Sequence, residues 1–289
     1  MLDWYVFALL GFFLIGLQRF LYKVAASRGY SASRTTFSFM LTVALLSGFL
    51  YILWPTPLAS PGLLLVFSLI NSLGFVSATV AHISALRYLS GSIVFPVIRL
   101  NIVLVLLFSL LVLSESLDVL QWLGVALSVL AFFLFSGMDD PDPDSTYSRN
   151  RKGWMALGLA TVSGAVATVS SKLAADLGNL LAFIAISYAF STLFSWLWMH
   201  ISPEGREEGG KGQAAIWLGA GIGALNLAGF YFYLWALSLG PLSIVATING
   251  MHFVVPVILS VAIYRDRLTV PRLVGIGATC AALILFRGF

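Results

Sequence analysis

The sequence predicts an all-α integral membrane protein of ten transmembrane helices, arranged as two inverted repeats of five helices. Three observations predict this fold class. Hydrophobic residues make up 60% of the chain and charged residues only 10%, whereas about 25% of a soluble protein is charged. Breaks at glycine, proline and charged residues divide the chain into ten apolar stretches, each of about 20 residues, the length that crosses a bilayer. Motifs of the first half return in the same order in the second half.

The ten spans are expected at residues 4–25, 34–54, 62–87, 92–113, 118–137, 153–175, 180–200, 214–238, 242–264 and 270–287. Asp3 precedes the first stretch where a signal peptide would carry basic residues, so we expect a transmembrane helix there. The acidic, proline-rich segment from Asp139 to Lys152 is typical of a solvated linker. The sequence therefore predicts a first repeat over 1–138, a polar linker over 139–152 and a second repeat over 153–289.

The repeat rests on pairs of equivalent residues. Lys23 and Lys172, 149 residues apart, each begin a Lys-x-Ala-Ala motif, and Asn71 in the first half corresponds to Asn226 in the second half. Pairs at a spacing of 151 are Ala85-Leu86 with Ala236-Leu237, Ser92-Ile93-Val94 with Ser243-Ile244-Val245, Glu115 with Asp266, and Gly124 with Gly275. Because five is odd, the second repeat enters the membrane from the opposite side, and a pseudo-two-fold axis in the membrane plane relates the halves. Repeated membrane spans of this kind are the usual construction of a secondary transporter.

The order and spacing of these motifs resemble the EamA-type transporters of the drug/metabolite transporter superfamily over nearly the whole chain. The segments that carry the resemblance are Ala85–Tyr88, Ile93–Val97, Glu115–Leu117 and Trp122–Gly124, with Ala236-Leu237, Ser243–Val245, Pro256-Val257, Asp266–Leu268 and Gly275–Gly277. The resemblance implies a ten-helix carrier whose central cavity is lined by spans one to four and six to nine. Such carriers move amino acids, nucleobases, nucleotide sugars, phosphorylated metabolites, choline or drugs.

The basic residues predict an orientation. Twelve of them lie at the odd-numbered connections between spans, whereas Lys172 and Arg287 lie on the opposite side. The positive-inside rule then places the odd-numbered connections in the cytoplasm and both termini outside. The family resemblance implies the reverse, with both termini inside. We expect the membrane to be the cytoplasmic membrane of a bacterium or archaeon.

Arg99 is the first candidate for a functional residue. It lies seven residues beyond the start of the fourth span, roughly 10 Å deep at 1.5 Å per residue. A charge at that depth costs at least about 2.5 kcal/mol on insertion scales and is functional by default. The alternative is an arginine that pairs with backbone carbonyls or reaches the lipid headgroups. Because no span core contains an acidic residue to neutralise Arg99, an anionic substrate is favoured.

Other polar residues in the spans also need a partner in protein or water. Asn71 and His82 share a stripe in the third span, and Asn249 and His252 share a face of the ninth. The predicted substrate-binding residues are Gln18, Asn71, His82, Arg99, Asn101, Asn226, Tyr233, Trp235, Asn249 and His252. The alternative for the asparagines is hydrogen bonding between helices, and for His252 it is a satisfied core histidine. Pro96 and Pro256 interrupt spans four and nine and are predicted hinges for gating.

The functional hypothesis is a secondary transporter that moves a small polar or anionic metabolite, an amino acid or organic acid, by alternating access. The alternatives are a carrier for cationic or neutral aromatic compounds and a membrane receptor or scaffold that transports nothing. An enzyme is not expected, because no His-Glu-x-x-His or Gly-x-Ser-x-Gly motif is present. We also expect no cofactor, no metal site and, with a diffuse formal charge of +4, no nucleic acid partner. The expected partners are a small-molecule substrate and the lipid bilayer, for a monomer or, alternatively, a homodimer.

Overall fold

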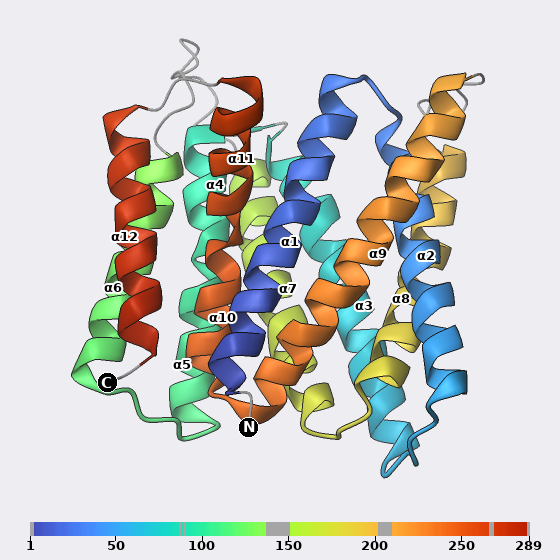
Figure 1. Cartoon of the computed structure of the whole chain (residues 1–289), viewed down its shortest axis with the longest axis horizontal. Coiled ribbons are helices and arrows are strands. Elements are labelled where there is room, and N and C mark those ends of the chain that lie inside the picture. The colour runs from blue at the N-terminus through green and yellow to red at the C-terminus, as the bar shows by residue number, and fades with distance from the viewer. Residues whose placement is uncertain are drawn as a thin grey trace.

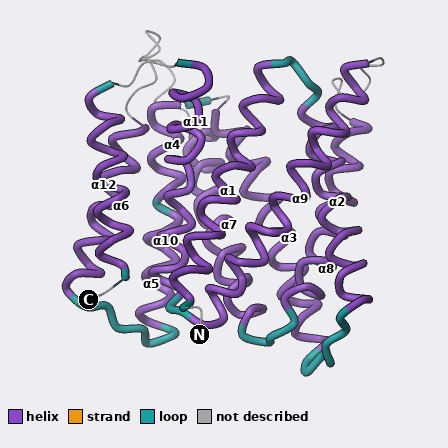
Figure 2. The backbone as a smooth tube through the Cα atoms, in the orientation of Figure 1, coloured by secondary structure: helices purple, strands orange, loops and turns teal. Residues whose placement is uncertain are grey.

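The structure is a computed structural model that describes residues 3–86, 88–89, 91–136, 151–201, 210–265 and 269–287. The regular elements in these residues are all helices (Figures 1 and 2). In chain order they are α1 (Trp4–Ser27), α2 (Ala32–Leu53), α3 (Pro61–Leu86), α4 (Gly91–Arg99), α5 (Asn101–Leu111), α6 (Val119–Ser136), α7 (Arg151–Ala175), α8 (Leu180–Ile201), α9 (Gly210–Leu239), α10 (Leu242–Gly250), the 3₁₀ turn η3 (Met251–Phe253), α11 (Val254–Tyr264) and α12 (Val270–Phe286).

These helices form the ten expected spans, and the predicted all-α membrane fold is confirmed. Both the first and the last residue of each span lie within four residues of the predicted bounds. Two spans are interrupted, one being α4 with α5 and the other α10 with η3 and α11. Among the described segments, seven are apolar and long enough to cross a membrane, and three further apolar helices are shorter. The protein is therefore an integral membrane protein.

The two halves run in opposite directions through the molecule. In Figure 1, α1 rises from the end where both termini lie, which we call the terminal face, whereas α7 descends toward it. The helix ends that flank the odd-numbered connections lie at the other end, which we call the basic face. The first helix of each half packs on the third helix of the other, α1 on α9 and α7 on α3. The second helices, α2 and α8, pack on each other, as do the last, α6 and α12.

Glycines let two of these helices approach closely. A Cβ atom added at Gly219 would lie 2.5 Å from the carbonyl oxygen of Thr35, and one at Gly223 would lie 2.8 Å from that of Phe39. Both glycines therefore face the backbone of α2, four residues apart on one side of α9. A Cβ at Gly221 would meet nothing within 4 Å. The α2–α9 contact depends on the first two glycines.

Candidate functional site: a central cavity

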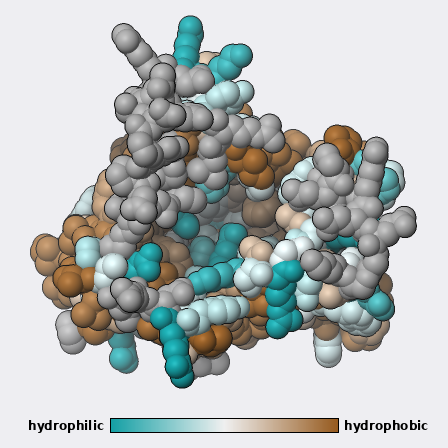
Figure 3. All heavy atoms as spheres, turned by 90° about the horizontal axis from the view of Figure 1, so that it is seen from above, coloured by the Kyte–Doolittle hydropathy of each residue, from teal (hydrophilic) through white to brown (hydrophobic). Residues whose placement is uncertain are grey.

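A cavity of about 420 Å³ lies between the two halves. Eight spans line it, and α6 and α12, the fifth and tenth spans, contribute none of the described lining residues, as the family resemblance implies. Figure 3, a view onto the basic face, shows the molecule hollowed at its centre with polar residues in the hollow. The cavity is thus accessible from the basic face.

The lining follows the internal repeat. On α1 the lining residues are Ile15, Gln18, Arg19 and Tyr22, and the residues 149 positions later, Gly164, Ala167, Thr168 and Ser171 on α7, line the cavity as well. On α3 and α9 the equivalent lining residues are Asn71, Phe75 and Ala78, with Asn226, Phe230 and Tyr233. The residues on α7 were not among the predicted site residues. The register of the repeat, applied to Gln18, is the signal that would have found them.

Both interrupted spans break beside the cavity. Leu100 separates α4 from α5, and Met251, 151 residues later, begins the turn between α10 and α11. At Leu100 the backbone N–H donates to the carbonyl of Val97 at 3.0 Å, a tight turn in place of the α-helical bond. A broken helix frees backbone groups that only a protein- or water-lined cavity can satisfy in a membrane. The breaks therefore place backbone polar groups next to the polar side chains of the site.

The predicted hinge prolines lie near these breaks but not at them. Pro96 is within α4, four residues before Leu100, and its side chain lies outside those the structure describes. Pro256 is the third residue of α11, a position in the first turn where a missing N–H costs no helical hydrogen bond. The ninth span breaks before Pro256, so the proline lies in the first turn of a new helix.

Two arginines bring positive charge to the cavity. The guanidinium carbon of Arg99 lies 5.7 Å from the ring centre of Phe253, and that of Arg19 lies 5.6 Å from the ring of Tyr22. Both arginines act electrostatically on His82 and on His252. None of the described residues that line the cavity is acidic. The described lining thus carries a net positive charge.

A chain of hydrogen bonds joins three helices along another side. The Tyr188 hydroxyl donates to Asn226 Oδ1 at 2.6 Å, Asn226 Nδ2 donates to Gln18 Oε1 at 2.9 Å, and Gln18 Nε2 donates to the Tyr22 hydroxyl at 3.2 Å. Gln18 and Asn226 are both buried. Each amide donates once and accepts once within the chain. These bonds support the interpretation that Gln18 and Asn226 hold α1, α8 and α9 together.

Asn71 makes the equivalent connection in the other half. Its Nδ2 donates to the Ala167 carbonyl and to Ser171 Oγ, both at 2.8 Å. Asn71 thus ties α3 to α7, as Asn226 ties α9 to α1. Both asparagines line the cavity, but their amides already bind neighbouring helices.

The remaining predicted residues divide between two places. His82, Asn101, Tyr233, Asn249 and His252 line the central cavity. Nδ1–H of His252 donates to the Asn249 carbonyl, and Asn249 Oδ1 is buried without a hydrogen-bond partner among the described residues.

Trp235, in contrast, does not line the central cavity. It stacks on Phe7, with ring centres 4.7 Å apart, and lines a smaller cavity of about 240 Å³ together with Trp54 and Tyr231. Nine of the ten predicted substrate-binding residues therefore line the central cavity.

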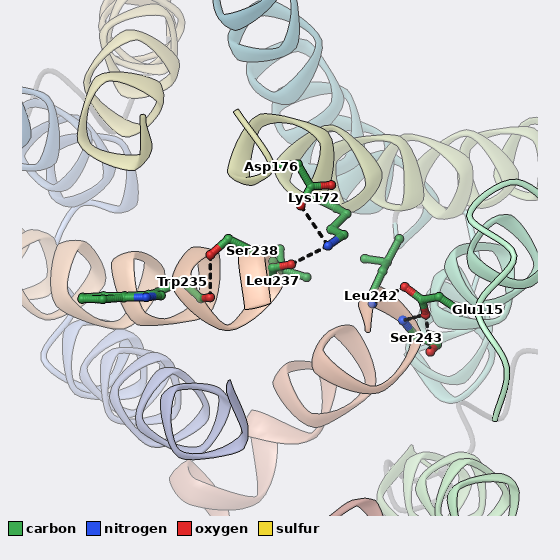
Figure 4. Close-up of polar contacts among 8 residues, drawn as sticks. All are labelled: Glu115, Lys172, Asp176, Trp235, Leu237, Ser238, Leu242 and Ser243. Atoms are coloured by element: carbon green, nitrogen blue, oxygen red, sulfur yellow. Dashed lines mark hydrogen bonds and ion pairs between the residues drawn. The ribbon is translucent and has the colours of Figure 1, made fainter. Parts of the chain in front are cut away.

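Glu115 closes a contact between the halves on the terminal face (Figure 4). Its carboxylate accepts hydrogen bonds from the backbone N–H groups of Leu242 at 2.6 Å and Ser243 at 3.1 Å, and from the Ser243 hydroxyl at 2.6 Å. The Ser109 hydroxyl donates to it as well. Burial alone would raise the pKa of the Glu115 carboxyl, but these hydrogen bonds outweigh burial and hold that pKa below its usual value. Asp266, its repeat equivalent, lies outside the described residues.

Lys172 stabilises the α9 side of the connection between α9 and α10, opposite Glu115. Its ammonium donates to the Leu237 carbonyl at 2.6 Å and pairs with Asp176 at 2.9 Å (Figure 4). The end of α9 thus receives a positive charge and the start of α10 receives the carboxylate of Glu115, the signs that helix dipoles favour. Lys23, the equivalent of Lys172, instead donates to Ser260 Oγ at 2.9 Å. Equivalent residues of the two halves therefore have different partners.

Comparison with known proteins identifies the class. A profile of the EamA-like transporter family matches residues 2–137 and 151–288. The chain belongs to the EamA-like transporter family, and the prediction from its motifs is confirmed.

A relative described as an uncharacterized transporter in the cobO 3′ region of a Sinorhizobium species is 34% identical over 73 residues. The match covers 25% of this chain and 52% of that relative, so it spans about half the relative's length. A solved structure described only as the crystal structure of a protein covers 98% of both chains, with a TM-score of 0.74 at 18% identity, which shows a shared fold. The family and the relative's description support a membrane transporter rather than an enzyme.

Proposed function

We propose that this protein is a secondary transporter that carries a small polar or anionic metabolite, of the amino acid or organic acid class, by alternating access. One observation carries the substrate class: Arg19 and Arg99 line a cavity whose described lining contains no carboxylate. A charge removed from water is costly unless a counter-ion is present. A carboxylate or phosphate would supply that counter-ion through charge-assisted hydrogen bonds.

Alternating access is supported by the unequal environments of the two halves. The cavity reaches the basic face, whereas Glu115 and Lys172 fasten the corner between α9 and α10 on the terminal face. Residues Leu242 to Ile248 of α10 are all buried. If the halves exchanged environments, the cavity would open to the terminal face, as inverted repeats allow. Pro96 and Pro256, next to the two breaks, are the hinges we propose for this exchange.

The substrate-binding roles follow from what each side chain already binds. Arg99 is the proposed ligand of the substrate's anionic group, with His82, Asn101, Asn249 and His252 around it. Tyr233 contributes an aromatic surface, whereas Gln18, Asn71 and Asn226 position helices at the edge of the site. Trp235 would meet substrate only at the terminal face.

The charge count supports an orientation with the basic face in the cytoplasm. The open cavity then takes substrate from the cytoplasm. We propose a cytoplasmic membrane of a bacterium or archaeon as the location, with the lipid bilayer and the small-molecule substrate as partners.

A thermal-shift screen of the purified protein tests this function. Metabolites grouped as anions, cations and neutral compounds are compared on the wild type, Arg99→Gln and Arg28→Gln, the last being an exposed arginine at the end of α1. We expect an anion to stabilise the wild type and Arg28→Gln but not Arg99→Gln, and to be carried into proteoliposomes.

Arg99→Lys, which keeps the charge, distinguishes loss of the anion ligand from loss of folding. Stabilisation only by cations, or stabilisation by anions that Arg99→Gln leaves intact, would contradict the proposal.

A further inference from the structure

Five aromatic side chains form a continuous wall of the central cavity. They are Tyr22, Phe39, Tyr188, Phe230 and Tyr233, from α1, α2, α8 and α9. In that order, neighbouring ring centres are 6.2, 5.9, 6.0 and 6.0 Å apart. Most of these pairs are edge to face, the arrangement that aromatic quadrupoles favour. We call these five residues the aromatic wall.

The aromatic wall presents aromatic rings, rather than hydroxyl groups, to the cavity. Phe39 and Phe230 have no polar atoms. Phe39 and Tyr233 are buried, so the accessible ring surface comes mainly from the partly exposed Tyr22, Tyr188 and Phe230. The Tyr188 hydroxyl donates to Asn226, and the Tyr22 hydroxyl accepts from Gln18. Two of the three tyrosine hydroxyls are thus already hydrogen-bonded within the protein. What remains is an apolar surface suited to a flat apolar group.

The cavity carries its positive charge on two arginines. Arg99 ends α4, a helix that contributes no residue to the aromatic wall, whereas Arg19 lies beside Tyr22 at the edge of the aromatic wall. The cavity therefore has a cationic side, at Arg99, and an aromatic side. A short hydrophilic anion would use only the cationic side and would leave the aromatic wall against water. A ligand that uses both sides carries an anionic group and an aromatic body together.

We infer that the substrate is an aromatic carboxylate, with its carboxylate at Arg99 and its ring against Tyr188 and Phe230. This inference rests on the proposed function and narrows the substrate class of the same site. The cavity volume of about 420 Å³ lies in the lower part of the range of small-molecule sites, about 300–1,000 Å³. A compact acid with one ring fits such a volume.

Four matched probes test the inference by calorimetric measurement of binding to the wild-type protein in detergent. They are 3-phenylpropanoate, 3-cyclohexylpropanoate, 3-phenylpropylamine and 3-phenylpropanol. The first two share charge and size and differ in aromaticity, whereas the last two keep the ring and change the charge. We expect 3-phenylpropanoate to bind about 2- to 10-fold more tightly than its cyclohexyl counterpart, and the amine and the alcohol to bind more weakly than both acids.

Variants assign the two halves of the ligand to the two sides of the cavity. Phe230→Leu keeps an apolar side chain and should remove the preference for the aromatic acid, with little change for the cyclohexyl acid. Arg99→Gln should weaken both acids. Phe49→Leu makes the same substitution at an exposed position on α2 and should change neither.

The outcomes separate this inference from the proposed function. Equal binding of the two acids in the wild type, with both lost in Arg99→Gln, would overturn the aromatic inference and leave the anion site standing. Tighter binding of the amine or the alcohol than of either acid would overturn both. Binding of none of the four probes would overturn the inference, and the metabolite screen would then decide the proposed function. Because the wild-type comparison needs no variant, misfolding of Phe230→Leu would not rescue the inference.

Discussion

Glu115 binds Ser243 twice, accepting hydrogen bonds from its backbone N–H at 3.1 Å and from its hydroxyl at 2.6 Å. The two residues belong to different halves of the protein. The connection between α5 and α6 is thereby fastened to the start of the interrupted ninth span. Any opening of the terminal face has to release α10 from this carboxylate.

Replacing Glu115 by glutamine should weaken this contact. Hydrogen bonds to a charged group are worth about 1.5–3 kcal/mol each, and the neutral amide retains only one acceptor oxygen for the same donors. We expect a lower melting temperature in detergent. We also expect faster labelling of a cysteine at Ile244, which is buried on α10, in a Cys280→Ser background.

Asp118→Asn is the control for Glu115→Gln. Asp118 lies in the same connection, but its carboxylate accepts from the Gln121 N–H at 2.8 Å within the first turn of α6, where asparagine also caps well. Equal effects of the two substitutions would show that Glu115 does not link the halves.

The Glu115 contact should also depend on pH. Because the pKa of Glu115 is lowered in the folded protein, its contribution to stability is complete above the unfolded value of about 4.3 and is lost as the pH falls through the folded-state pKa. The difference in melting temperature between the wild type and Glu115→Gln should therefore shrink below about pH 4.3. A difference that stays constant from neutral to acid pH would contradict this assignment.

Lys172→Met should destabilise the corner between α9 and α10. The substitution leaves the Leu237 carbonyl without the ammonium that it binds at 2.6 Å, and an unpaired buried acceptor costs about 1–3 kcal/mol. Asp176→Asn removes only the ion pair, whose acidic side chain is 43% exposed, and such pairs contribute about 0–1 kcal/mol. Melting temperatures should therefore fall clearly for Lys172→Met and little for Asp176→Asn. The reverse order would place the stabilisation in the ion pair.

Two glycines on α9 provide a matched test of helix packing. Gly223→Ala adds a Cβ atom 2.8 Å from the Phe39 carbonyl oxygen and should separate α2 from α9, which lowers the yield of monodisperse protein. Gly221→Ala adds a Cβ with no neighbour within 4 Å, and alanine favours a helix over glycine by about 1 kcal/mol. Size-exclusion chromatography and melting temperature should show loss for the first and no loss for the second. Equal behaviour would mean that the α2–α9 contact tolerates a methyl group.

The spans could be predicted because a bilayer sets their length and polar residues mark their ends. The breaks at Leu100 and Met251 could not, because they depend on packing between halves. A Cβ at Gly16 on α1 would lie 2.8 Å from the carbonyl oxygen of His252, and one at Gly164 on α7 would lie 3.1 Å from Asn101 Nδ2. The prolines indicated the right spans, but these tertiary contacts lie at the breaks themselves.

The candidate site was partly predictable for a similar reason. A deep polar residue needs a polar surrounding, which is why nine of the ten predicted residues line one cavity. The sequence does not show which partner each amide has, so it does not decide between substrate binding and helix contact for Asn71 and Asn226. Trp235 follows Tyr233 by two residues, about 200° around a helix, so the two cannot face the same cavity. That geometry was available from the sequence alone.

Lys23 and Lys172 bear on the alternating-access cycle that we propose. They are equivalent in sequence, yet Lys172 binds the Leu237 carbonyl at the end of α9 and Lys23 binds Ser260. Leu86, 151 residues before Leu237, ends α3. In the alternating-access exchange that we propose, each half adopts the other's present arrangement, so we expect Lys23 to reach the Leu86 carbonyl and Lys172 to release that of Leu237. Under this proposal, the present contacts of each half are the ones that the other half forms in the opposite state.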